Sequence, residues 1–179
     1  KYELGLFDNP YRFLDEKREK EVIGSKANRE AVLDMAKQSI VLLKNDTNLL
    51  PLKNSGHKIV LLGSLAESKN SPLGSWRIAA DSNTAVSVLE GMQQYKGNSL
   101  NYVKGLELTK VEPTFLTEVE YNTTDKSGFE QAKKAAKEAD VVVMVLGEHG
   151  FSTGEARSRT NLDLPGLQQE FLEEIYKIN

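Results

Sequence analysis

The stretch VVVMVLG at positions 141–147 decides the fold class of this chain. It is short, continuously apolar, rich in β-branched residues and closed by a glycine, which is typical of a strand buried on both faces of a parallel sheet. A second stretch, KIVLLG at 58–63, has the same character, and residues 100–103 alternate more weakly as a further strand. Strands of this kind need covering layers, so the intervening sequence is expected to supply helices.

Helical periodicity flanks these strands. Apolar spacings of three and four residues predict helices over 25–40, 85–92, 129–139 and 167–178, and Ser25 is the expected N-cap of the first. Because helices alternate with buried strands, the chain is predicted to be an α/β protein, with a mostly parallel sheet sandwiched between helices in three layers. A chain normally returns from such a last helix to the sheet, so we expect a domain truncated at its C-terminus.

Residues 1–25 differ from the rest. They hold an aromatic-rich patch and then a charged run, with no period running through either. Such a segment is interpreted either as a linker that lies across another surface or as an ordered arm packed on its own domain. The regular α/β pattern occupies residues 26–179.

Composition excludes several classes of protein. The 179 residues include 23 basic and 26 acidic side chains, a net charge of −3, so we expect no nucleic-acid partner. No apolar run approaches the roughly 18 residues of a membrane-spanning helix, so a soluble chain with no membrane partner is expected. There is no cysteine, which excludes disulfides and cysteine-based metal sites but leaves the cellular compartment open.

Two loops follow the buried strands, at the end of a parallel sheet where ligands gather. One contains Trp76, which either stacks on a ligand or packs as a core or interface aromatic. The other, residues 148–159, is dense in reactive side chains, listed here: Glu148, His149, Glu155, Arg157, Arg159. It lacks a phosphate-binding glycine fingerprint, a GxSxG nucleophile elbow and the clustered ligands of a metal site. A solvated, salt-bridged loop is the alternative to a functional one.

Glu155 is the carboxylate of most interest, since Gly154 and Ala156 leave it unhindered at a loop tip. Such a side chain can enter a neighbouring site as a general acid. Glu148 directly follows the strand and either binds a substrate or anchors the loop by hydrogen bonds; the anchoring role is the favoured interpretation.

Several motifs together resemble glycoside hydrolase family 3. They are SIVLLKN followed by LLPL within 39–52, KIVLLGS at 58–64, LGSW at 73–76, TAVSVLEGM at 84–92, VVVMVLGE at 141–148 and GEARSRTNLDLPGLQ at 154–168. They fall in the family's order and cover nearly the whole chain from about residue 26. GLFDNPY at 5–11 is similar to the tail that leaves the preceding barrel, so residues 1–25 are expected to link that barrel to the α/β sandwich.

The resemblance implies a retaining exo-β-glycosidase, a β-glucosidase first and a β-xylosidase second. In this family a (β/α)₈ barrel supplies an Asp nucleophile and the second domain supplies the acid/base, which corresponds to Glu155. Trp76, Glu148, His149, Arg157 and Arg159 are the expected substrate-binding or supporting residues. The resemblance implies no metal, no cofactor, a β-linked glycoside or oligosaccharide as substrate, and a periplasmic or secreted whole protein.

The chain by itself is too short to hold the barrel, so the isolated piece is expected to be inactive and to expose apolar surface, with a homodimer as one consequence. The alternative function from another class is a non-catalytic carbohydrate-binding or interaction module.

Overall fold

A computed structural model describes residues 1–77 and 79–179 of the chain. By their internal contacts these residues form two compact units, Lys1–Pro51 and Leu52–Asn179. The predicted boundary after residue 25 differs from this division by contacts, because it separates an expected barrel tail from the α/β domain. That boundary stays a prediction. No helix in the described part of the chain has both the length and the hydropathy that crossing a bilayer requires.

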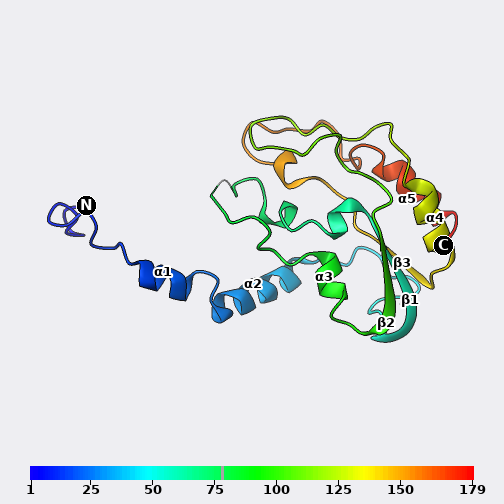
Figure 1. Ribbon diagram of the computed structural model, residues 1–179, viewed down its shortest axis with the longest axis horizontal. Coiled ribbons are helices and arrows are strands. Elements are labelled where there is room, and N and C mark those ends of the chain that lie inside the picture. The colour runs from blue at the N-terminus through cyan, green and yellow to red at the C-terminus, as the bar shows by residue number, and fades with distance from the viewer. Residues whose placement is uncertain (78) are drawn as a thin grey trace. The chain divides into compact units, whose positions relative to one another are not determined.

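Within the described part of Leu52–Asn179, three parallel strands form the sheet: β1 (Ser55–Leu62), β2 (Gly97–Val103) and β3 (Val141–Met144). Their order is β2-β1-β3, which places β1 in the centre (Figure 1). Ile59 of β1 lies opposite both Leu100 and Val141, and this sets the register of the sheet. The predicted parallel arrangement is therefore confirmed.

The strand β3 is shorter than the apolar run that predicts it. Pairing extends one residue beyond its end, where the Val145 N–H donates to the Leu62 carbonyl at 2.9 Å. At Gly147 the backbone N–H instead donates to the side-chain oxygen of Gln168, also at 2.9 Å. The end of the run is thus bound by a helix side chain rather than by a neighbouring strand.

Helices cover both faces of this sheet, as the three-layer prediction requires (Figure 1). The helices of this unit are, in chain order, α3 (Val88–Met92), α4 (Phe129–Lys137) and α5 (Gln168–Tyr176), with 3₁₀ turns η1 (Ser64–Ala66), η2 (Ser71–Leu73) and η3 (Gly150–Ser152) in the described loops. Val60 and Leu62 pack with α4 and α5, where the rings of Phe129 and Phe171 lie 4.8 Å apart between centroids. Because side chains alternate along a strand, Ile59 faces the opposite layer, which holds α3.

The helix α3 begins later than its apolar spacing suggests, because Ser87 ends the preceding segment as an N-cap. The Ser87 hydroxyl accepts from the Glu90 N–H at 3.1 Å, and the Glu90 carboxylate accepts from the Ser87 N–H at 3.0 Å. This reciprocal capping box satisfies two backbone donors that the first turn leaves free. Lys69 also donates to Glu90 at 2.8 Å, which ties the loop after β1 to this helix.

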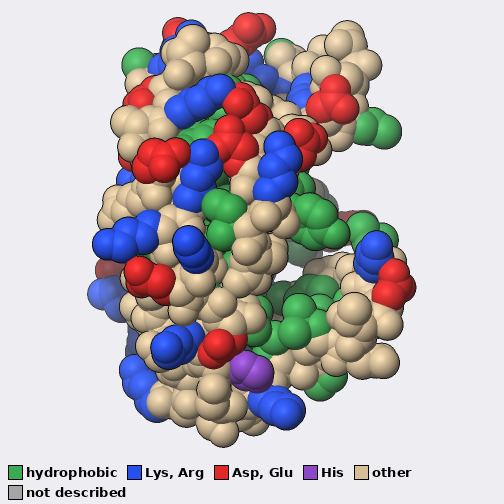
Figure 2. Space-filling model, turned by 90° about the vertical axis from the view of Figure 1, so that its right-hand side faces the viewer, with side chains coloured by type: hydrophobic (Ala, Val, Ile, Leu, Met, Phe, Trp, Pro, Cys, Tyr) green, Lys and Arg blue, Asp and Glu red, His purple; other side chains and the backbone are tan. Residues whose placement is uncertain are grey.

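The side of this unit that carries α4 and α5 presents mixed charge. Figure 2 shows Lys and Arg interspersed with Asp and Glu over it. Lys133 of α4 pairs with both Glu130 and Glu174, and Lys126 pairs with Glu170. On this face of the described chain the two signs of charge are therefore interspersed rather than gathered into a patch of one sign.

The unit Lys1–Pro51 holds α1 (Glu16–Val22) and α2 (Lys26–Ser39). Ser25 caps α2 through the Asn28 N–H, so the predicted helix and its cap are confirmed. The apolar residues that predicted α2 are exposed, Val32 at 68 %. The charged helix α1 was missed because it has no apolar period; its signal is Asp15, which accepts from the Arg18 N–H at 2.9 Å as an N-cap.

Candidate active site

The loops that follow β1 and β3 pack against each other at the carboxyl end of the sheet. They leave adjacent parallel strands, so they start side by side. The Gly150 N–H donates to the Ser71 hydroxyl at 3.2 Å, and a Cβ added at Gly150 would lie only 2.7 Å from the Ser71 carbonyl oxygen. A Cβ at Gly154 would lie 3.7 Å from the indole nitrogen of Trp76. The structure thus brings the two predicted loops into one surface.

Gln168 closes the base of the second loop. Its side chain is 2 % exposed and bonds both backbone groups of Gly147, accepting from the N–H and donating to the carbonyl at 2.8 Å. The same amide donates to the Pro165 carbonyl at 2.9 Å. One side chain therefore joins the residue before Glu148 to the end of the loop. This role could not be predicted from the sequence, because a glutamine at a helix start is usually a surface residue.

Glu148 and Arg159 form an ion pair across the loop. The Arg159 guanidinium also donates to the side chain of Asn161 at 2.9 Å and to the carbonyl of Asp163. Its contacts thus run from the first residue of the loop almost to its end. This is the arrangement that an anchoring role for Glu148 requires.

Arg157 binds three backbone carbonyls. Its Nε donates to Phe151 at 3.1 Å, and one terminal nitrogen donates to Phe115 and Thr117, both at 2.8 Å. A planar guanidinium suits this role, since its donors are fixed in one plane. Phe115 lies in a polar stretch without periodicity, and its one sequence signal is the apolar pair Phe115-Leu116.

His149 is half-buried and its ring supports the loop. The Phe151 N–H donates to its Nδ1 at 3.1 Å, so His149 caps the turn η3. Burial lowers the pKa of His149, Arg77 lowers it further, and Glu112 opposes them. The ring is therefore neutral near pH 7, with its proton on Nε2, because Nδ1 accepts.

Aromatic rings line the junction of the two loops. Trp76 is 63 % exposed, so it is not a core residue of the described unit. Its ring lies 6.1 Å from that of Phe115, which in turn lies 6.2 Å from Phe151. The guanidinium of Arg77 stacks 4.4 Å above the Phe151 ring. Trp76 is thus the exposed end of a row of aromatic contacts.

Glu155 is exposed between two residues with positive φ, Gly154 at 109° and Ala156 at 60°. An alanine in the left-handed region costs about 1 kcal/mol, so the turn at Ala156 is a strained one. Within residues 1–77 and 79–179, the Glu155 carboxylate makes no ion pair. The loop is therefore fixed on either side of a carboxylate that is left accessible.

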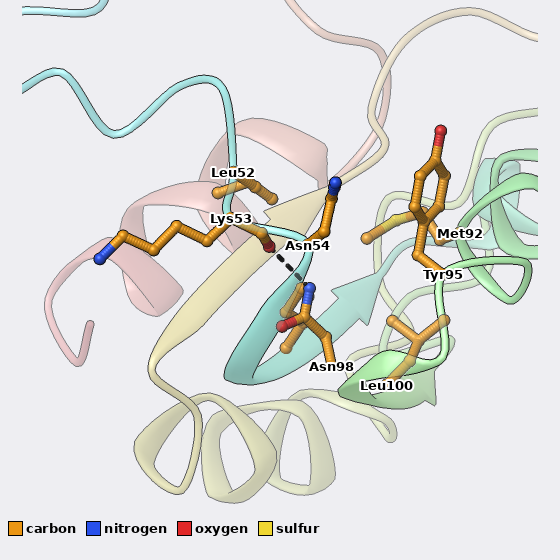
Figure 3. A pocket seen from close by; sticks show the side chains of 8 residues that line it. Leu52, Lys53, Asn54, Met92, Tyr95, Asn98 and Leu100 are labelled. Atoms are coloured by element: carbon orange, nitrogen blue, oxygen red, sulfur yellow. Dashed lines mark hydrogen bonds between the residues drawn. The ribbon is translucent and has the colours of Figure 1, made fainter.

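The hollows in the described part of this unit include two that differ in character and position. One, of about 790 Å³, is bordered by residues within 118–123 and by the loop after Glu155, and its lining mixes polar and apolar side chains. The other, of about 260 Å³, is apolar and lies between α3 and the amino-terminal parts of β1 and β2, where Asn98 donates to the Lys53 carbonyl at 2.9 Å (Figure 3). The second is at the end of the sheet away from Glu155. Among the described residues, no three His, Asp or Glu side chains gather as metal ligands.

Comparison with known proteins identifies the family to which the chain belongs. Residues 40–179 match the model described as "Glycosyl hydrolase family 3 C-terminal domain". The chain belongs to glycosyl hydrolase family 3. The resemblance stated from the sequence motifs is thereby confirmed, and the α/β sandwich described above is the C-terminal domain of family 3.

Two curated relatives show how much of a family 3 protein this chain represents. It is 38 % identical to "Periplasmic beta-glucosidase" of Salmonella typhimurium, over 96 % of this chain and 24 % of that protein. It is 35 % identical to "Beta-xylosidase" of Formosa agariphila, over 99 % of this chain and 23 % of that protein. The chain thus spans about a quarter of the length of these family 3 relatives.

Solved structures agree with this assignment to family 3. The fold matches that of β-glucosidase from Listeria innocua in complex with isofagomine, with a TM-score of 0.80, 29 % identity, and coverage of all of this chain and 23 % of that one. It also matches a β-glucosidase involved in saponin metabolism from intestinal bacteria, with a TM-score of 0.83, 26 % identity, and coverage of 99 % of this chain and 26 % of that one.

Proposed function

We propose that this chain is the acid/base-bearing domain of a retaining exo-β-glycosidase and that Glu155 is the acid/base. The observation that carries the proposal is an exposed carboxylate, free of an ion pair within the described residues, on a loop fixed on both sides. Family membership supports a (β/α)₈ barrel in the same enzyme as the source of an Asp nucleophile. Residues 1–25 would then be the tail that leaves the barrel.

The chemistry needs two carboxyl groups about 5 Å apart across the scissile bond. The Asp attacks the anomeric carbon while Glu155 gives its proton to the glycosidic oxygen, and the aglycone leaves as an alcohol. Glu155, now a carboxylate, takes a proton from water, whose oxygen attacks the anomeric carbon and releases the Asp. The sugar is freed with its original anomeric configuration, and the proton count returns to its starting value.

The surroundings of Glu155 suit such a proton shuttle. Arg157 and Arg159 are the cations nearest to Glu155 along the chain. Arg157 donates to backbone carbonyls, and Arg159 donates to the side chains of Glu148 and Asn161. They stiffen the loop without holding the Glu155 carboxylate. Positioning of this kind matters, because proton transfer requires hydrogen-bond distance to the leaving oxygen.

The substrate class is a terminal β-linked sugar, with a β-glucoside ahead of a β-xyloside, since the matched relatives carry both names. The periplasmic name of one relative supports a periplasmic or secreted enzyme. Because α2 exposes apolar side chains, we further propose that the separate chain forms a homodimer.

The test is the variant Glu155→Gln in the full-length enzyme. We expect hydrolysis of alkyl glycosides to fall by about a thousandfold or more, and that of dinitrophenyl glycosides, whose leaving group needs no proton, to fall far less in the glycosylation step. Glu138→Gln, at the exposed C-cap of α4, is the matched control. Equal loss on both substrates would refute the acid role, and turnover by the isolated 179-residue chain would refute the need for a barrel.

One observation favours a second candidate function, a non-catalytic carbohydrate-binding module. Trp76 is an exposed ring of the kind that stacks on a pyranose. Calorimetry of the isolated chain with glucose or cellobiose separates the two: tight binding favours the module, and its absence favours a half-site completed by the barrel.

A further inference from the structure

Phe115 lies beside the loop that carries Glu155, although it is distant from that loop in sequence. Its carbonyl accepts from Arg157, two residues after Glu155, and its ring contacts Trp76 and Phe151. The ring keeps 37 % of its surface exposed. Phe115 therefore reaches the candidate site through a backbone bond on one side and a ring contact on the other.

Several polar groups of residues 114–117 are paired with Arg157 or with one another. The carbonyls of Phe115 and Thr117 both accept from Arg157. The hydroxyls of Thr114 and Thr117 bond each other at 2.8 Å. Phe115 and Leu116 thus offer a ligand an aromatic ring surface and an exposed apolar side chain.

A general acid gives its proton to the oxygen that departs with the aglycone. Side chains packed beside the acid's loop therefore lie near the first atoms of the aglycone rather than deep in the sugar site. Together with Trp76, the Phe115 ring makes an apolar wall on that side of the loop.

We propose, on the basis of the proposed function, that Phe115 is a specificity-determining residue that contacts the aglycone and favours aromatic or other apolar leaving groups. Arg157 is the positioning residue that holds it. Neither role follows from Glu155 itself, since a shuttle for protons needs no apolar wall.

The test compares two glycosides of the sugar that the full-length enzyme accepts, one with a 2-phenylethyl and one with an ethyl aglycone. Both leave as alkoxides that need a proton, so they differ in apolar contact and not in acid demand. In Phe115→Ala we expect the ratio of kcat/KM between the two, 2-phenylethyl over ethyl, to fall about fivefold, the worth of one aromatic contact. In Phe115→Trp the ratio should be kept. Val111→Ala, a truncation at another exposed apolar site of the same segment, is the control and should leave it unchanged.

Arg157→Met removes all three carbonyl bonds and is expected to lower the same ratio. If Arg157 acts through Phe115, the double variant Phe115→Ala, Arg157→Met shows no further fall in the ratio beyond Phe115→Ala. Additive falls in the ratio would refute the positioning role. Equal losses on both substrates in Phe115→Ala, or no change on either, would overturn the specificity role.

The two proposals fail in different ways. If Glu155→Gln hydrolyses the ethyl glycoside normally, the proposed function is wrong. If Glu155→Gln abolishes that hydrolysis while Phe115→Ala leaves the aglycone ratio unchanged, the proposed function stands and the role of Phe115 is wrong.

Discussion

Gln168 provides the sharpest test of how the loop of residues 148–165 is held. Its buried amide makes three hydrogen bonds, two to Gly147 and one to Pro165. Replacing it with methionine keeps the volume and apolar contacts of the side chain close to those of glutamine but removes every one of these bonds. The backbone groups they served then lose their partners.

The magnitude follows from the bond count. A backbone group left without a partner in a buried setting costs about 1–3 kcal/mol. Gly147 is partly exposed, so water can reach some of the freed groups; we therefore take about 1 kcal/mol per bond and expect Gln168→Met to lower the free energy of unfolding by about 3 kcal/mol. The neighbouring Gln169 donates only to Glu173 on the exposed side of α5. Gln169→Met is therefore the matched control, with an expected loss of about 0.5 kcal/mol or less.

The assay is urea unfolding of the 179-residue chain. Trp76 is the sole tryptophan of the sequence and belongs to Leu52–Asn179, so its fluorescence follows that unit and not Lys1–Pro51. Circular dichroism provides the second probe. A loss below about 1 kcal/mol in Gln168→Met, or one equal to that of Gln169→Met, would refute the view that this amide clamps the loop.

Two further predictions concern the frame of the site. Gly63 has φ 105° and ψ 140°, and a Cβ there would collide with the Val145 carbonyl oxygen, whereas Gly74 (φ 78°, ψ −176°) has open space around it. Gly63→Ala should therefore cost about 2–4 kcal/mol in urea unfolding and clearly more than Gly74→Ala, and equal costs would show that backbone strain alone decides. The bonds from Lys69 and the Ser87 backbone lower the pKa of Glu90 below its ordinary value. Since the folded pKa lies below the unfolded one, this carboxylate stabilises the fold above about pH 4.3 and stops doing so as the pH falls through the folded pKa. Unfolding midpoints measured from neutral to acidic pH should accordingly converge for wild type and Glu90→Gln at the acid end, and a constant difference would contradict the linkage.

Much of the fold was readable from local pattern. The continuous apolar runs ending at Gly63 and Gly147 predicted parallel strands, because a strand covered on both faces has no need of polar alternation. Ser25 predicted the start of α2 from its capping chemistry alone. Where the prediction missed, as at α1, the helix buries nothing, so no apolar period marks it.

The candidate site, like the fold, could be predicted from the sequence only in part. Glu148 and Glu155, which follow β3 closely in the chain, stand out in the sequence because small or charged neighbours mark their loop. Phe115 and Gln168 did not stand out, since their roles are contacts with residues tens of positions away along the chain.

The sequence by itself determined which segments become strands and helices and which loop carries the accessible carboxylate, because these depend on period, capping and neighbouring residue size. Only the tertiary structure decided that Arg157 donates to the carbonyl of Phe115 and that Gln168 forms hydrogen bonds with the backbone of Gly147. Such bonds depend on how parallel strands align their loops in space, and a guanidinium or an amide can serve any carbonyl that packing brings within its reach.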